Sequence, residues 1–129
     1  MEATGTAHLA NRAYMTLSGG EKQRVIIASA LVHRPEVIIV DEPMVGLDPK
    51  SARLLKDLFR EFVSRGGTVL MSTHTMEIAE VMCDRIAIVY RGKIAAQGTM
   101  AELRRQTSSE GMSLEDLFLK LTGGHHAQR

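Results

Sequence analysis

The chain has 129 residues, 44% of them hydrophobic, which is enough for one ordinary domain and leaves little room for a second. A net charge of +1 and an aromatic content of 4% argue against a nucleic-acid-binding surface, and no apolar run reaches the roughly 20 residues that span a bilayer. The single cysteine, Cys83, cannot form an internal disulfide, which suits a reducing cytosol, and we expect it to be a small buried side chain.

The first strong signal along the chain is Leu17–Arg24, which follows a short helix expected over Ala7–Ala13. Ser18 and Glu21 have the spacing of a capping box, so a helix should begin there and run to about His33. Two glycines at the start of such a helix would let a phosphate come close to its N–H groups. Taken alone, the segment fits a plain capped helix with a glycine turn better than a phosphate site, so its context has to decide.

Val37–Val40 is a continuous apolar run that ends in Asp41, Glu42 and Pro43. Such a run is typical of a strand that is buried on both faces of a parallel sheet. Ligands bind beyond the carboxyl ends of the strands in these sheets, which would bring both acids within reach of a substrate. The alternative is a strand followed by a solvated acidic turn, and on this segment alone the two interpretations are evenly matched.

A helix and a second strand are predicted next. Asp48 and Pro49 suit the N-cap and first residue of this helix, which Gly66 and Gly67 end. Its expected core residues are Leu54, Leu55, Leu58, Phe59, Phe62 and Val63. A right-handed crossover would make the strand Thr68–Ser72 parallel to the first.

His74 follows this second strand directly. A lone histidine after a strand is more often a turn or capping residue than a catalytic one. If the two strands are neighbours, however, their ends would bring His74 toward Asp41 and Glu42. Both interpretations are kept open at this point.

The rest of the chain is expected to combine short helices with a β-hairpin. The predicted elements are a helix over Thr75–Met82, strands over Ile86–Tyr90 and Lys93–Gln97, a capped helix over Thr99–Gln106 and a helix over Ser113–Thr122. Residues 123–129 should be a frayed tail, where His125 and His126 suit a disordered end better than a metal site.

The expected fold class is therefore α/β, with a parallel sheet core flanked by helices and a C-terminal β-hairpin with short helices. Residues 1–106 would form the main domain. Residues 107–129 would form a linker, a short helix and the tail.

Four segments together resemble the C-terminal half of an ATP-binding cassette (ABC) transporter ATPase subunit. Leu17–Arg24 is similar to the signature motif of that family, Val37–Pro43 to its Walker B strand with the adjoining glutamate, Gly46–Asp48 to its D-loop, and His74 to its switch histidine. Each motif alone is weak evidence, but the order and spacing of the four agree with those of the family over about Thr16–Leu103. The resemblance implies a P-loop NTPase-like fold, present in part.

The resemblance also implies a site for ATP and Mg²⁺. Asp41 would hold Mg²⁺ through water, Glu42 would act as the general base on the attacking water, and His74 would orient and sense the γ-phosphate. Asp48 would lie at a dimer interface as well as capping its helix. The signature residues that would bind the ATP held by a second subunit are Ser18, Gly19, Gly20 and Gln23.

This sequence departs from the family in one large respect. The glycine-rich loop with its lysine that grips the phosphates is absent, and so is the glutamine loop that normally follows it. One side of the nucleotide site is therefore missing, and we expect the chain to be a fragment of a full ATPase that cannot bind ATP tightly alone. We also expect a marginally stable domain, because one edge of its sheet lacks a neighbouring strand.

The resemblance implies two protein partners, namely a second ATPase subunit and a transmembrane permease that would hold the chain at the inner face of the cell membrane. No nucleic-acid partner is expected. The hairpin, Gly98–Thr99 and the final helix resemble exporters whose permeases are separate chains. The alternatives are a soluble ABC ATPase that acts on ribosomes or DNA, and an inactive fragment that acts only by pairing with an intact subunit.

Overall fold

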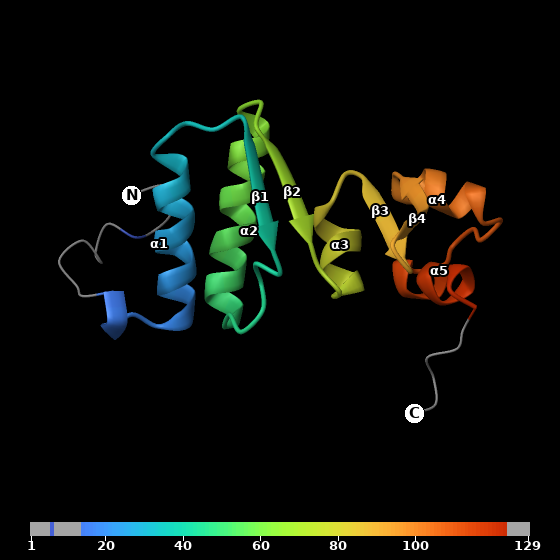
Figure 1. Ribbon diagram of the computed structural model, residues 1–129, viewed down its shortest axis with the longest axis horizontal. Helices are drawn as coiled ribbons and strands as arrows, with labels where there is room; N and C mark the ends of the chain where they lie inside the picture. The colour runs from blue at the N-terminus through green and yellow to red at the C-terminus, as the bar shows by residue number, and fades with distance from the viewer. Residues whose placement is uncertain (1–5, 7–13, 124–129) are drawn as a thin grey trace. The chain divides into compact units, whose positions relative to one another are not determined.

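The computed structural model describes Thr6 and residues 14–123, and its contacts divide the chain into two units, Met1–Ser72 and Thr73–Arg129 (Figure 1). The helix expected over Ala7–Ala13 and the two histidines of the tail lie outside the described residues. The domain boundary that the sequence predicts after residue 106 stays a prediction.

Among its described residues, the first unit contains three helical elements and two strands. They are the 3-10 helix η3 (Tyr14–Thr16), α1 (Gly19–Leu31), β1 (Val37–Asp41), α2 (Pro49–Ser64) and β2 (Thr68–Ser72). In Figure 1, β1 and β2 run side by side, and α2 contacts both α1 and β2.

The capping box predicted at the start of α1 is confirmed. The N–H of Glu21 donates to the Ser18 hydroxyl at 3.2 Å, and the N–H of Ser18 donates to the Glu21 carboxylate at 2.7 Å. The helix ends at Leu31 rather than at about His33. Arg34 takes a φ of 47° there, and its N–H donates to the carbonyl of Leu31 at 3.0 Å, which closes a turn instead of continuing the helix.

The two strands pair in parallel, as predicted. Val37 faces Thr68 at one end of the ladder and Asp41 faces Ser72 at the other. The helix between the strands therefore serves as the crossover that a parallel pair requires. The carboxyl ends of both strands meet at the same edge.

The prediction that β1 is buried on both faces is wrong for the described chain. Ile38 is buried, but its neighbours Val37 and Ile39 are 52% and 75% exposed, and Leu70 on β2 is 60% exposed. Side chains alternate between the faces of a strand, so this pattern means that one face of the pair is covered and the other is open. The described residues supply no second layer for the open face.

Helix α2 buries three of its six predicted core residues, and a fourth, Phe62, is half-buried. Leu55, Leu58 and Phe59 are buried, whereas Leu54 and Val63 are more than one third exposed and do not belong to the core. These two residues lie at the margins of the apolar stripe, where a helix turns its side chains toward solvent.

The second unit contains three helices and an antiparallel hairpin among its described residues. The elements are α3 (Met76–Met82), β3 (Ile86–Tyr90), β4 (Lys93–Gly98), α4 (Met100–Gln106) and α5 (Leu114–Leu121). The hairpin turns at Arg91 and Gly92, both with positive φ, which matches the right-handed twist of its strands. Thr99 and Glu102 form the second predicted capping box.

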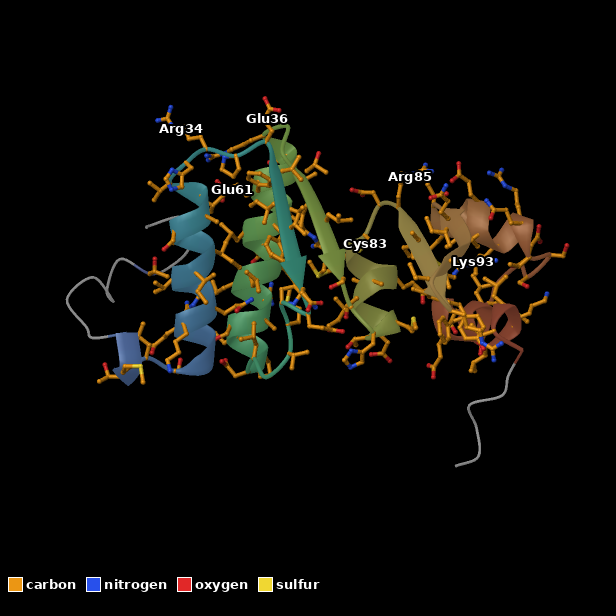
Figure 2. All side chains as sticks on the ribbon, viewed as in Figure 1. Arg34, Glu36, Glu61, Cys83, Arg85 and Lys93 are labelled. Atoms are coloured by element: carbon orange, nitrogen blue, oxygen red, sulfur yellow. The ribbon has the colours of Figure 1, made fainter. Side chains whose placement is uncertain are left out.

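One apolar cluster holds the second unit together. Its buried members are Ala79, Ile88, Leu103, Leu114 and Leu117. Cys83, labelled in Figure 2, is half-buried and packs against this cluster, and burial raises the pKa of its thiol, with a smaller contribution from Asp84. None of the helices within the described ranges is both long and apolar enough to cross a bilayer.

Candidate functional site

The two acids predicted to carry chemistry lie at the tip of β1, where the end of β2 holds them. The hydroxyl of Ser72 donates a hydrogen bond to the carboxylate of Asp41. The backbone N–H of Glu42 donates to the carbonyl of Ser72 at 2.8 Å. Ser72 was not among the predicted site residues. The pairing of the strands in register is what brings it beside Asp41.

Glu42 has an unusual backbone conformation for its residue type. Its φ is 44°, in the left-handed region that residues with a Cβ atom rarely adopt. Besides the bond to Ser72, its carbonyl accepts the N–H of Val45 at 3.3 Å, so the fold fixes both sides of the residue. Conformational strain of this kind is found at functional sites, where the surrounding structure offsets its cost.

We expect Glu42→Gly to be more stable than Glu42→Ala by about 1 kcal/mol in free energy of unfolding, because only glycine adopts a positive φ without cost. Glu42→Gly should therefore unfold at a higher urea concentration. Both variants lose the carboxylate, so the difference between their stabilities reports the backbone strain at position 42 alone. Urea denaturation of the 129-residue chain measures it.

The matched control is the pair Arg53→Gly and Arg53→Ala on the exposed side of α2. There the order should be the reverse, with glycine less stable by about 1 kcal/mol. If alanine is the better residue at both positions, Glu42 is not strained.

Ser18 and Gly19, which are predicted to contact a nucleotide, lie at the exposed start of α1. Ser18 is the N-cap, and a hydroxyl that accepts the cap bond still has its own hydrogen to donate. A Cβ atom added to Gly19 would meet no atom within 4 Å. No packing in the described chain therefore requires glycine at 19, and the backbone there is open to an approaching group.

Gly20 is different, because it lies against the start of α2. A Cβ atom added there would come within 2.5 Å of the Ser51 hydroxyl and 3.6 Å of a carboxylate oxygen of Asp48. Glycine at 20 is thus needed for α1 and α2 to pack, whatever its role toward ATP. Gln23, on the next turn of α1, is half-buried. Sequence reasoning missed Ser51, and its position three residues after an N-cap was the available signal.

Asp48 caps α2, as predicted. Its carboxylate accepts the N–H of Ser51 at 3.1 Å. The hydroxyl of Ser51 and then its backbone N–H hold the pKa of Asp48 below its ordinary value of 3.8, because both bonds favour the charged form. The predicted place of Asp48 at a dimer interface stays a prediction.

We expect the Asp48 cap to make folding sensitive to acid. A carboxyl group with a lowered folded-state pKa stabilises the fold fully above its unfolded value, and this contribution is lost as pH falls through the folded value. Asp48→Ser keeps a capping oxygen that does not titrate. The urea midpoint of the wild type should therefore fall more steeply below about pH 4 than that of Asp48→Ser. Equal slopes would contradict the assignment, and Asp48→Ala should lower the midpoint at pH 7 as well.

His74 lies in the second unit, two residues after Ser72, and it is exposed. The N–H of Thr75 donates to the Thr73 hydroxyl at 3.0 Å, which shapes the turn that carries the histidine. Asp41 and Glu42 belong to the first unit. The approach of His74 to the two acids stays a prediction.

The acid pair suits Mg²⁺ bound together with a phosphate ligand rather than a metal held by protein alone. In the described part of the chain, no group of three or more His, Cys, Asp or Glu side chains could hold a metal ion. Mg²⁺ commonly takes one or two carboxylates and completes its shell with water and substrate phosphates. The exposed carboxylate of Asp41, with one oxygen bonded to Ser72, fits that kind of contribution.

Comparisons with known proteins agree with these motifs. A protein-family model described as "ABC transporter" matches residues 1–45. The chain is 40% identical over 111 residues to the phosphonates import ATP-binding protein PhnC of Agrobacterium fabrum, covering 85% of this chain and 39% of that protein. It is 45% identical over 82 residues to the Nod factor export ATP-binding protein I of Burkholderia orbicola, covering 64% and 27%.

A solved structure of an ATP binding subunit of an ABC transporter has the same fold over most of the chain. The TM-score is 0.84 and the identity 34%, with 93% of this chain and 51% of that chain covered. The chain spans about half the length of the first curated relatives that it matches.

Proposed function

The chain belongs to the ATP-binding cassette family, and on this premise we propose that it is part of the ATP-hydrolysing subunit of a membrane transporter of the exporter type. The observation that carries the proposal is the acid pair at the tip of β1, tied to the end of β2 by Ser72. Asp41 is exposed and Glu42 has a strained backbone, and the pair lies at the carboxyl edge of parallel strands, where such a fold binds its substrate.

Each predicted residue has a role in this function. Asp41 would hold Mg²⁺, which when bound neutralises charge on the phosphates. Glu42 would take a proton from the attacking water, from a backbone that is fixed on both sides. His74 would orient the γ-phosphate. The exposed start of α1 at Ser18 and Gly19 would contact the ATP of a second subunit, together with Gly20 and Gln23.

The exporter type and the membrane location are proposed from the second unit. Among the relatives, one has export in its name and another has import. The hairpin and final helix of the second unit are the features that favour an exporter with a separate permease. The chain would then lie at the inner face of the membrane, bound to the permease and to a second ATPase subunit.

A hybrid protein tests the proposal. This chain would replace the matching half of the solved ATP binding subunit with 34% identity, so that the other half of that subunit completes the domain. We expect the hybrid to hydrolyse ATP in the presence of Mg²⁺ and the 129-residue chain alone to show no turnover above its own Glu42→Gln variant.

A folded hybrid that binds ATP without hydrolysing it, next to an active host protein, would instead favour an inactive module that works by pairing. Turnover that depends on added ribosomes or DNA would favour the soluble alternative. Either result would overturn the transporter ATPase proposal.

A further inference from the structure

We propose that Ser72 is a positioning residue for the acid pair, with its hydroxyl orienting the Asp41 carboxylate and its carbonyl fixing the backbone of Glu42. This inference rests on the proposed function, because it assigns Ser72 to the same site. In this role Ser72 would act through Asp41 and Glu42 rather than on the substrate itself.

The strand register brings Asp41 and Ser72 together. Asp41 and Ser72 are paired residues of parallel strands, so their side chains project from the same face of the pair. That face is the open one, on which Ile39 and Leu70 are exposed. The Ser72 hydroxyl donates directly to the Asp41 carboxylate and so orients it there.

The hydrogen bond from Ser72 engages only one oxygen of the Asp41 carboxylate. The Ser72 hydroxyl donates to one oxygen, Oδ1, and a carboxylate has a second oxygen with its own lone pairs. A carboxylate held in this way offers that second oxygen in a defined direction to a metal or to a metal-bound water. Hydrogen bonds of this kind orient metal ligands in proteins, and their loss commonly weakens metal binding by about 10- to 100-fold.

Ser72 holds Glu42 with a different group, its backbone carbonyl. Its carbonyl accepts the Glu42 N–H at 2.8 Å, where the backbone takes a φ of 44°. A side-chain substitution at 72 leaves this backbone bond in place. The hydroxyl can therefore be removed to disturb Asp41 while Glu42 keeps its position.

The test compares Ser72→Thr with Ser72→Val in the 129-residue chain. The two side chains have nearly the same shape and both suit a strand, but only threonine keeps the hydroxyl. Mn²⁺ with inorganic triphosphate serves as the probe, since Mn²⁺ binds the same oxygen ligands as Mg²⁺ and broadens nearby NMR signals, and the triphosphate supplies the phosphate oxygens that complete its shell. The apparent affinity is read from the broadening of the Asp41 and Ser72 amide signals, with Asp41→Asn as the reference for loss of the ligand.

We expect Ser72→Thr to bind Mn²⁺ like the wild type and Ser72→Val to bind it about tenfold more weakly. The amide shifts of α2 should be the same in both variants, which excludes unfolding as the cause. The Glu42 amide shift should also stay the same, because the backbone bond to Ser72 is retained.

Equal Mn²⁺ affinity in the threonine and valine variants, with binding lost in Asp41→Asn, would overturn the role of Ser72 and leave the metal role of Asp41 intact. If Asp41→Asn binds Mn²⁺ as well as the wild type, the proposed metal role of Asp41 fails instead. The two failures are thus distinguishable.

Discussion

Replacing Glu42 by glutamine is expected to lower ATP turnover of the hybrid protein by about 10²- to 10⁴-fold, the usual contribution of a general base. ATP binding should be unchanged, because glutamine keeps the shape and the backbone of Glu42 and removes only its ability to accept a proton. Turnover is measured by phosphate release, and binding by fluorescence of a labelled nucleotide under the same conditions.

The matched control for this prediction is Glu36→Gln. Glu36 is exposed and precedes β1, so it stands at the opposite end of the strand from the acid pair (Figure 2). The same chemical change there should leave turnover unaltered. If Glu42→Gln hydrolyses ATP as fast as Glu36→Gln, Glu42 is not the general base. If Glu42→Gln binds the nucleotide more weakly than the unsubstituted hybrid, Glu42 contacts the bound ATP before the reaction.

Replacing Leu117 by alanine is expected to destabilise the second unit by about 2–5 kcal/mol, because the side chain is fully buried and leaves a cavity. Leu117 lies in the cluster that also contains Leu103 and Ile88. Urea denaturation followed by circular dichroism measures the loss. A local readout is available in Cys83, which packs against the same cluster and should react faster with a thiol reagent in the variant.

Leu119→Ala is the matched control, two residues further along α5. Leu119 is 37% exposed, against 0% for Leu117, so its truncation should cost only about 0.5–1 kcal/mol. Similar losses for the two variants would mean that the cluster does not hold the second unit together. A large loss confined to Leu117 would confirm the assignment of the core.

Local sequence signals predicted the ends of several elements correctly. The capping boxes at Ser18 and Thr99 and the N-cap at Asp48 are found as expected. These features depend on residues three positions apart, whose hydrogen bonds close within one turn of chain, so no tertiary contact is needed to specify them. The hairpin turn at Arg91 and Gly92 is local in the same sense.

The motifs also identified the family, since their order along the chain is a property of the sequence. Contacts between distant residues were not predictable in this way. The apolar run of β1 indicated burial on both faces, yet its residues alternate between covered and exposed because the described chain covers one face only. An apolar run in the sequence makes both faces of a strand suitable for burial, and only the neighbouring layers decide which face is buried.

The sequence by itself determined the elements, their caps, the family and the two acids at the tip of β1. The tertiary structure alone decided that Ser72 lies beside Asp41 and that Gly20 must be glycine to let α1 approach Ser51. Both are contacts between residues about 30 positions apart, which strand register and helix packing create. No local pattern encodes them, because each partner would be unremarkable at its position without the other.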